Sequence, residues 1–485
     1  MEIPTAAKKS RGIKTKIVAT IGPATWDDNV LKKMINNGMR VARVNASFAD
    51  YDEFLRVTTQ IRSLSTDVSL LLDTMGHKIR VTGFKDSIEV KTGEQICLTY
   101  QGGKHHKEYK TIEVTYNHIV RDMTRNATIL IDDGNIILKV QDIDDELLMC
   151  DVIKGGSIFY RKTVTIPNVH LSFPPMTAKD KEDIKTAIEL KYEYVSASFV
   201  RDIDDAKAFR RELGDSGIKL IAKIENYEGI LNFERIIDEV DGVMIARGDL
   251  GVELPIEYVP YLQKKMIRKC REKGKIVIVA TQMLESMKDN DKPTRAEVSD
   301  IANAIYDGTD AIMLSAETST GKYPILAVDM MRKVASITEP DVEPDIMYTD
   351  TESADETDTI CIQTAEMTKI QDLKGIIVIT KTGKTIRSLV RHRIKPLVWC
   401  VTHDPFLAKQ LIISRGVTPI YMPNISDDRD KLIHQTIKHI YSLGELHLKD
   451  KVAIIFGSTI KGKSINDILE IVQVKNVLSE LSELE

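Results

Sequence analysis

Short apolar runs recur along the chain, and each run stops abruptly in charged or hydroxyl residues. Runs of this kind are typical of strands buried in a parallel sheet, and the segments between them have apolar positions at helical spacing. Eight such runs lie at 16–20, 41–45, 69–73, 194–199, 220–225, 243–246, 276–280 and 311–314. Eight strands that alternate with helices predict an α/β fold of the (β/α)8 TIM-barrel type.

The alternation of strands and helices breaks between about Gly76 and Pro174. Short runs with strand character are separated there by Gly, Asp and Asn turns, and no helical period is present. These runs include 96–100, 127–131, 135–141 and 157–161. The pattern predicts a small all-β lid domain, 76–172, inserted between the barrel segments 1–75 and 173–345.

The last part of the chain, 346–485, reads as a separate domain. It opens with an acidic, hydroxyl-rich stretch at 349–358, which is typical of a linker or an exposed loop. Apolar runs then alternate with amphipathic helical stretches, at 375–379, 397–401, 419–422 and 452–456. This order predicts a doubly wound α/β domain.

Composition and charge narrow the class of partner. The chain has 67 Lys and Arg residues against 72 Asp and Glu residues, a formal net charge of −5, and no basic cluster interleaved with aromatics, which argues against nucleic acid. No apolar run approaches the ~20 residues of a membrane span, and residues 1–15 lack a signal-type apolar stretch. The five cysteines have no CxxC pairing, so we expect reduced thiols in a cytoplasmic protein that binds no membrane.

The ends of four predicted strands carry candidate chemistry. Because strand C-termini converge on one face of a barrel, Lys223 and Glu225 would lie near Asp249, Thr281 and the 315–317 segment. Glu225 and Asp249 can supply oxygen ligands to one Mg²⁺. Lys223 points to the same side of its strand as Glu225 and is costly to bury unless it meets an anion.

Weaker signals accompany these residues. Gly248 and Asp249 precede a short turn, 250–253, whose free N–H groups could bind a carboxylate. The Thr281 hydroxyl could position a water or a carboxylate oxygen, and a plain strand-terminal hydrogen bond explains it equally well. Arg43 and Arg80 suit phosphoryl binding. Side chains at other strand ends also carry oxygen atoms, in Asn45, Ser47, Asp73 and Thr74. These oxygens could bind a second cation or could make structural hydrogen bonds.

Taken together, the strand-end segments resemble the pyruvate kinase family. The matching segments are TKIVATIGP (15–23), VARVN (41–45), LDTMG (72–76), AKIEN (222–226), MIARGDLG (244–251), ATQMLESM (280–287), PTRAE (293–297) and IMLS (312–315). They run through the whole barrel, and the position of the inserted β domain fits as well. The resemblance implies transfer of the phosphoryl group of phosphoenolpyruvate to ADP, giving pyruvate and ATP.

The resemblance also implies roles for individual residues. Lys223 would stabilise the phosphoryl group in flight, Arg43 would contact it, and Thr281 with a bound water would relay the proton to the enolate. Glu225 and Asp249 would hold Mg²⁺ or Mn²⁺. The carboxylate of the enolpyruvate would be bound by Ala246, Gly248 and Thr281. The nucleotide would be bound, as the lid closes, by Asn45, Arg80, Lys162 and Asp133.

The chain departs from the usual family pattern at two places. Phe48-Ala49 stands where most members have His-Gly after Asn-x-Ser, which puts nucleotide affinity or preference in question. Lys78 stands where most members have Glu. In this family Lys at that position accompanies independence of K⁺, so the resemblance implies that the tethered ammonium substitutes for K⁺ and that K⁺ is dispensable.

Two lysine-bearing loops of the C-terminal domain are candidate sites for a phosphorylated allosteric effector. Gly-, Ser- and Thr-rich turns before a helix can bind anions, although two ordinary basic turns explain the sequence as well. The candidate residues are Thr380, Lys381, Thr382, Gly383, Lys384, Thr385, Lys461 and Lys463, the last two in the 456–464 segment after the expected final strand. Family members are usually homotetramers.

Two other readings of the sequence compete with a kinase. One is a different barrel enzyme that handles phosphoenolpyruvate, such as a lyase or the acceptor half of a dikinase, against which Arg80 and Lys162 argue. The other is a pseudoenzyme that senses effectors, suggested by Phe48 and His77. The intact set of catalytic strand ends favours the kinase.

Overall fold

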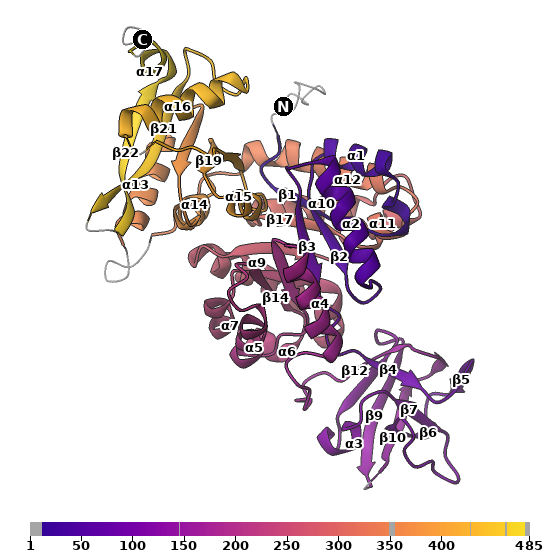
Figure 1. The fold of residues 1–485 in the computed structure, drawn as a ribbon. Coiled ribbons are helices and arrows are strands. Elements are labelled where there is room, and N and C mark those ends of the chain that lie inside the picture. Colours follow the sequence, from indigo (N-terminus) through magenta and orange to yellow (C-terminus); the bar gives the residue numbers. More distant parts are fainter. Residues whose placement is uncertain (1–11, 145, 349–354, 427, 461–462, 481–485) are drawn as a thin grey trace.

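The computed structural model describes residues 12–144, 146–348, 355–426, 428–460 and 463–480 (Figure 1). A closed barrel of eight parallel strands confirms the predicted fold. Around the barrel the strands follow the order β1, β17, β16, β15, β14, β13, β3, β2. Their bounds are β1 (Lys16–Thr20), β2 (Met39–Asn45), β3 (Ser69–Asp73), β13 (Tyr194–Ala197), β14 (Lys219–Ile224), β15 (Gly242–Ala246), β16 (Ile276–Ala280) and β17 (Ala311–Leu314).

Helices surround this barrel and begin where the sequence offers caps. The Asp27 side chain accepts from the backbone N–H groups of Asn29 and Val30 at the start of α1, and Thr177 and Thr294 form capping boxes at α4 and α10. The helices are α1 (Asp28–Asn36), α2 (Tyr51–Leu64), α4 (Ala178–Glu189), α5 (Ile203–Leu213), α6 (Tyr227–Leu231), α7 (Phe233–Glu239), α8 (Arg247–Glu253), α9 (Val259–Glu272), α10 (Arg295–Tyr306), α11 (Ala316–Ser319) and α12 (Pro324–Thr338). Short 3-10 turns are η1 (Pro23–Thr25), η2 (Ile256–Tyr258), η3 (Glu285–Lys288) and η4 (Glu339–Asp341).

The inserted lid is a second, antiparallel-rich barrel that leaves the main barrel after β3 and returns at α4. Seven strands close it in the order β10, β6, β7, β4, β12, β8, β9, and β5 pairs with β11 beside it. The elements are β4 (Ile79–Thr82), β5 (Ser87–Val90), β6 (Gln95–Tyr100), β7 (Thr111–Val114), α3 (Ile119–Asp122), β8 (Thr128–Ile131), β9 (Ile136–Ile143), β10 (Leu148–Lys154), β11 (Gly156–Phe159) and β12 (Thr163–Thr165). The one-turn helix α3 is the only helical segment among its described residues.

The C-terminal domain contains a five-stranded sheet in the order β20, β19, β18, β21, β22. The sequence predicted a last strand ending near Phe456, and this prediction is wrong: β21 continues to Ile460 and pairs antiparallel with one more strand, β22. The strands are β18 (Gly375–Ile379), β19 (Leu397–Thr402), β20 (Val417–Tyr421), β21 (Lys451–Ile460) and β22 (Lys463–Gln473). The helices are α13 (Glu356–Ile370), α14 (Lys384–Val390), α15 (Pro405–Leu411), α16 (Arg429–Ser442) and α17 (Val474–Glu480).

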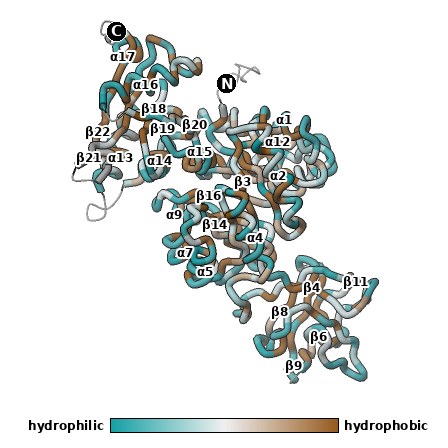
Figure 2. Tube along the Cα trace, viewed as in Figure 1, coloured by the Kyte–Doolittle hydropathy of each residue, from teal (hydrophilic) through white to brown (hydrophobic). Residues whose placement is uncertain are grey.

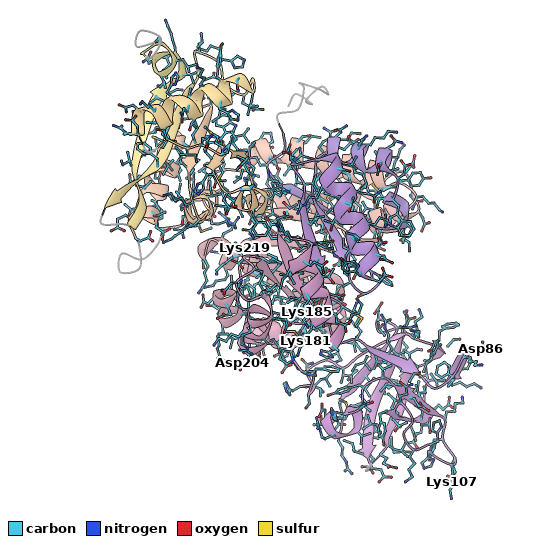
Figure 3. The ribbon with its side chains drawn as sticks, viewed as in Figure 1. Asp86, Lys107, Lys181, Lys185, Asp204 and Lys219 are labelled. Carbon is cyan, nitrogen blue, oxygen red and sulfur yellow. The ribbon has the colours of Figure 1, made fainter. Side chains whose placement is uncertain are left out.

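In Figure 2 the barrel strands are coloured mainly as hydrophobic residues, whereas the outer helices α5 and α7 are coloured mainly as hydrophilic ones. Charged side chains of both signs lie at the surface in Figure 3, for example Asp86 and Lys107 on the lid and Lys181 on α4. No helix in the described segments has the length and apolar character needed to cross a membrane. The five cysteines are all buried and unpaired.

The C-terminal domain closes the floor of the main barrel, at the N-terminal ends of its strands. Ile413 is fully buried in the apolar cluster of the barrel interior, together with Leu71 and Ile221. The Ser69 hydroxyl donates to the Lys409 carbonyl at 2.7 Å, so the strand start is tied to the same docking segment. The domain therefore supplies part of the barrel core.

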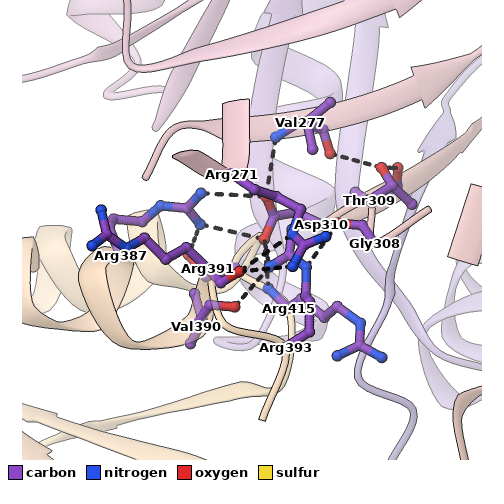
Figure 4. A network of polar contacts seen from close by, with 12 residues as sticks. Arg271, Val277, Gly308, Thr309, Asp310, Arg387, Val390, Arg391, Arg393 and Arg415 are labelled. Atoms are coloured by element: carbon purple, nitrogen blue, oxygen red, sulfur yellow. Dashed lines mark hydrogen bonds and ion pairs between the residues drawn. The ribbon is translucent and has the colours of Figure 1, made fainter. Parts of the chain in front are cut away.

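A buried carboxylate joins the two domains (Figure 4). Asp310 lies just before β17 and is fully buried, with Arg387 Nη2 at 3.2 Å and Arg393 Nη1 at 3.4 Å, both from the C-terminal domain. It also accepts from the backbone N–H groups of Val277 and Arg415 at 3.1 and 3.2 Å. Burial alone would raise the pKa of Asp310, but the two guanidinium groups outweigh burial and lower this pKa to about 2.

Candidate functional site

Lys223 is the centre of a charged cluster at the C-terminal end of the barrel. Its Nζ lies 2.9 Å from Glu225 Oε1 and 3.3 Å from Asp73 Oδ1, and it donates to Ser198 Oγ at 2.8 Å. Burial lowers the pKa of Lys223, but the carboxylates of Asp73 and Glu225 overcome this and raise it. The buried ammonium group of Lys223 therefore lies against two carboxylates that favour its charged form.

Asp73 is shared between two cations. Its Oδ2 accepts from Arg43 Nε at 2.7 Å, and Arg43 Nη1 donates to Thr20 Oγ1 at 2.7 Å. Burial would raise the pKa of Asp73, whereas Lys223 and Arg43 lower it, with a net lowering. The sequence placed Asp73 in a monovalent-cation pocket; the structure shows it orienting Arg43 and Lys223 toward one another.

The two predicted metal ligands lie on neighbouring elements. Glu225 is buried directly after β14, and its Oε2 accepts from the Phe199 backbone N–H at 2.8 Å. Asp249 is half-buried and has no hydrogen-bond partner for its carboxylate among the described residues. The turn predicted to follow Asp249 is corrected: helix α8 already begins at Arg247, so Gly248 and Asp249 stand in its first turn.

The donor set fits one hard cation that is completed by substrate oxygens. Burial raises the pKa of Glu225, and the nearby Asp249 carboxylate raises it further against the lowering effect of Lys223. Within the described part of the chain no three His, Cys, Asp or Glu side chains converge on a metal position. Mg²⁺ is commonly bound by one or two carboxylates with water and phosphate oxygens, which matches this pair.

Thr281 has an unusual backbone conformation at the end of β16. Its φ is 68°, in the left-handed region that β-branched residues rarely adopt. The hydroxyl accepts from the Gly248 N–H at 2.7 Å and donates to the Ala280 carbonyl at 2.6 Å. A Cβ on Gly248 would lie 3.4 Å from the Thr281 hydroxyl oxygen, so glycine permits the close approach of α8 to β16.

Arg247 was not singled out from the sequence, although it lies between two residues that were. Its Nη1 lies 2.7 Å from Asp300 and its Nη2 donates to the Thr281 carbonyl at 2.8 Å. Arg247 therefore holds the strained Thr281 peptide against α8. Ser198 was also missed, although it lies within the predicted strand 194–199, because its contact with Lys223 joins it to another strand.

The lid residues expected to bind nucleotide have partners within the lid. Arg80 Nη1 donates to the Arg161 carbonyl at 3.0 Å, and Lys162 Nζ lies 2.7 Å from Asp132. Asp133 accepts from the Thr163 hydroxyl at 3.1 Å. A cavity of about 140 Å³ separates the lid from the barrel, and its lining includes Lys78, Asp133, Glu225 and Asp249.

The proposed monovalent-cation oxygens lie on adjacent strands. Asn45 pairs in register with Asp73, and Asn45 Oδ1 accepts from the Ser47 N–H at 3.1 Å. Thr74 Oγ1 donates to the Ser196 carbonyl at 3.1 Å. Lys78 is exposed, with its Nζ 6.0 Å from the centre of the Phe199 ring.

The first candidate effector loop is a closed turn. Thr380 Oγ1 accepts from the Gly383 N–H at 3.0 Å, and Lys384 forms an ion pair with Asp355. Lys461 lies outside the described residues, as does the side chain of Lys463. Residues 456–460 lie in β21 and residues 463–464 lie in β22, so the expectation that this segment follows the final strand is wrong.

Comparisons with known proteins identify the family of the chain. A family model described as "Pyruvate kinase, barrel domain" matches residues 12–328, and "Pyruvate kinase, alpha/beta domain" matches residues 358–472. Pyruvate kinase from Clostridium acetobutylicum is 38% identical over 92% of this chain and 96% of its own length. A Staphylococcus aureus pyruvate kinase is 39% identical over 92% of this chain and 77% of its length.

A solved structure gives the same result for the fold. The crystal structure of a pyruvate kinase from Cryptosporidium parvum superposes with a TM-score of 0.88 at 31% sequence identity, and the match covers 96% of both chains. The family models, the relatives and the solved structure all point to one family. The chain belongs to the pyruvate kinase family and is a pyruvate kinase enzyme.

Proposed function

We propose that the cluster around Lys223 transfers the phosphoryl group of phosphoenolpyruvate to ADP, giving pyruvate and ATP. The observation that carries the proposal is the arrangement of Arg43 and Lys223 on the shared carboxylate Asp73, beside Glu225. Phosphoryl transfer depends mainly on positioning and on stabilising charge, and two fixed cations supply both.

The cluster is arranged before substrate arrives. Lys223 is held by Ser198 as well as by two carboxylates, so it loses little side-chain freedom when a phosphoryl group binds. An incoming phosphoryl oxygen would accept from Lys223 Nζ and from the Arg43 guanidinium. Asp73 keeps both donors oriented throughout, because its ion pairs to them are buried.

Glu225 and Asp249 would hold the divalent ion, Mg²⁺ or Mn²⁺. When bound, this ion supplies positive charge to the oxygens of the enolpyruvate and of the phosphoryl group. Burial raises the pKa of Glu225, and the carboxylates of Asp249 and Asp73 raise it further, so a divalent ion would relieve repulsion between buried negative charges.

The carboxylate of phosphoenolpyruvate is assigned to Ala246, Gly248 and Thr281. The Gly248 N–H donates to Thr281 Oγ1 and the Thr281 hydroxyl donates to the Ala280 carbonyl, so a bound carboxylate would take the place of these acceptors for the two donors. Thr281 with a water would then deliver the proton that converts the enolate to pyruvate. The strained Thr281 backbone supports a functional role, since such strain concentrates at active sites.

The lid completes the site on the nucleotide side. Closure of the cavity would bring Arg80, Lys162 and Asp133 toward the nucleotide, with Asn45 on the barrel side, and exclude competing water. Lys78 lines the same cavity and is the proposed substitute for K⁺ at the pocket of Asn45, Ser47, Asp73 and Thr74. Rates in K⁺-free buffer with tetramethylammonium test this, and a drop of orders of magnitude would exclude it.

The proposal extends to regulation, assembly and location. The 380–385 loop would bind a phosphorylated effector, the chain would form a homotetramer, and the protein would be cytoplasmic. The proposed domain bounds are 1–75 and 173–345 for the two parts of the barrel, 76–172 for the lid and 346–485 for the C-terminal domain. Unchanged substrate-saturation curves with both sugar phosphates and nucleoside monophosphates would remove the effector assignment.

A coupled assay tests the catalytic assignment. Pyruvate formed from phosphoenolpyruvate, ADP and Mg²⁺ is followed with lactate dehydrogenase, and its dependence on ADP separates a kinase from a lyase. Lys223→Met should lower kcat by about two to three orders of magnitude or more, as expected for a lost charge-stabilising donor. Lys219→Met is the matched control, because Lys219 starts the same strand and pairs with Asp241 at the opposite end of the barrel. Equal activity of the Lys223 variant and this control would refute the assignment.

A further inference from the structure

The lid is attached to the barrel by two short connections, 74–78 and 166–177 (Figure 1). One buried carboxylate fixes both connections near the barrel. Asp180 Oδ1 accepts from the Gly76 backbone N–H at 3.2 Å, and its Oδ2 accepts from the Thr177 N–H at 2.9 Å. A change in the position of the lid therefore has to occur in the part of each connection that lies between this anchor and the lid.

His77 and Phe173 stack on each other across the two connections. Their ring centres lie 4.5 Å apart, with an angle of 15° between the ring planes. Arg201 holds the second connection, because its Nη1 donates to the Leu171 carbonyl at 2.9 Å and its Nη2 to the Phe173 carbonyl at 3.0 Å. Arg201 is itself fixed by Asp205, which accepts from its Nε at 2.9 Å. The stack thus joins the first connection to a second one that is already clamped to the barrel.

One ring nitrogen of His77 is buried without a partner. The imidazole donates an N–H to the Pro174 carbonyl, whereas Nε2 has no hydrogen-bond partner among the described residues. In the neutral ring that donates through its other nitrogen, Nε2 carries only a lone pair. Protonation turns Nε2 into a second N–H donor, and a buried donor without an acceptor costs free energy. The stacked arrangement therefore favours the neutral form of His77.

The groups around His77 act in the same direction overall. Burial lowers the pKa of His77 most; Arg201 lowers it further, and the carboxylates of Asp180 and Asp205 only partly offset this. From the lid, Tyr116 packs against the phenylalanine of the stack. The cavity that His77 lines contains further charged side chains, from Lys78, Asp133, Glu225, Glu228, Asp249 and Glu253.

We propose that His77 is a positioning residue of the lid hinge, and that its protonation releases the stack on Phe173 and so weakens closure of the lid over the nucleotide. This inference rests on the proposed function, because it concerns the lid that would bind nucleotide. At neutral pH the stack holds the two connections together. At acidic pH the charged imidazole leaves Phe173 and Arg201 for solvent, and the open position of the lid is favoured.

Amide hydrogen exchange in peptides that span both connections tests the hinge. The wild type, His77→Phe and His77→Asn are compared at equal pH between about pH 8 and pH 5, so that the intrinsic pH dependence of exchange cancels. Phenylalanine keeps a ring for the stack, asparagine keeps a side-chain N–H, and neither takes a charge. As the pH falls, exchange in the wild type should rise by about threefold or more relative to both variants, as expected when a buried donor loses its partner. The same pH dependence in all three proteins would overturn the proposal.

Two other histidines provide controls. His105→Gln removes an exposed lid histidine that pairs with Glu113, and it should keep the acid-induced rise in exchange. His170→Gln removes a histidine of the second connection, whose Nδ1 lies 2.7 Å from Glu228. This variant should also keep the rise, because protonation of His170 strengthens an ion pair. A rise that is lost in His170→Gln and kept in both His77 variants would overturn the assignment to His77.

The coupled assay connects the hinge to activity. From about pH 7.5 to pH 5.5 the KM for ADP should rise by about threefold in the wild type relative to His77→Phe, while the KM for phosphoenolpyruvate stays within about twofold. A hinge that responds to pH without this rise would overturn the link between the hinge and lid closure. Failure of the wild type to form pyruvate from phosphoenolpyruvate and ADP would instead overturn the proposed function, so the two results are distinguishable.

Discussion

Asp310→Asn removes the one negative charge that faces Arg387 and Arg393 at the floor of the barrel, while it preserves the size of the side chain. The carboxylate is fully buried, so solvent does not screen these ion pairs. Its pKa falls from 3.8 to about 2, which at about 1.4 kcal/mol for each tenfold change in proton affinity corresponds to roughly 2.5 kcal/mol. Breaking a buried ion pair from one side costs about 3 to 5 kcal/mol. We therefore expect the variant to lose about 3 kcal/mol at pH 7.

The pH dependence gives this prediction a second signature. A carboxylate with a lowered pKa in the folded protein stabilises it above the unfolded pKa, and this contribution is lost as the pH falls toward about 2. The difference between the wild type and Asp310→Asn should thus be complete at pH 7 and fall to roughly half at pH 3.

Urea unfolding followed by the fluorescence of Trp399 measures this difference, because Trp399 is buried in the C-terminal domain. Asp238→Asn is the control: Asp238 is 60% exposed and pairs with Lys273, so its loss should change stability by less than about 1 kcal/mol. An Asp310→Asn variant within about 0.5 kcal/mol of the wild type at pH 7, or a deficit that does not shrink at pH 3, would refute the reasoning.

Three further predictions concern the barrel interior, the metal ligands and a buried carboxyl group. Ile413→Ala should lower the free energy of unfolding by about 2 to 5 kcal/mol in urea, because it leaves a cavity in the barrel interior, whereas Ile337→Ala at a 65% exposed position should have little effect. Glu225→Gln should raise the Mg²⁺ concentration for half-maximal activity by about tenfold or more, measured by metal titration; an unchanged titration would exclude Glu225 as a ligand. Burial raises the pKa of Glu253 from 4.5 to about 7, so this group costs stability as the pH rises from 4.5 through 7. Glu253→Gln should accordingly unfold at higher urea than the wild type at pH 8 and show no gain at pH 4, and an equal effect at both pH values would contradict the assignment.

The barrel could be predicted because its eight strands are continuous apolar runs with abrupt polar ends. The alternation of side chains along a strand then predicted that Lys223 and Glu225 point to the same side, and the structure places their charged groups 2.9 Å apart. The last strand of the C-terminal domain was missed. β22 is an edge strand that pairs antiparallel with β21, and this pairing depends on a partner segment that local pattern does not specify.

Contacts between segments that are distant in the sequence could be identified only from the folded structure. Asp73 looked like a cation ligand in sequence, and only the register of β2, β3 and β13 shows that it orients Arg43 while it faces Lys223. The sequence around Asp310 does not indicate that it pairs with Arg387 and Arg393, because these residues lie 77 and 83 positions away in the chain.

The sequence by itself determined the eight strands of the main barrel, the residue types at their ends and thereby the family, because hydrophobic periodicity and short motifs are local properties. Tertiary structure alone decided which charges meet, how Thr281 is strained against α8, and that Ile413 fills the barrel floor. The physical reason is that ion pairing and close packing act over a few ångströms in space. Segments hundreds of residues apart reach that distance only after the chain has folded.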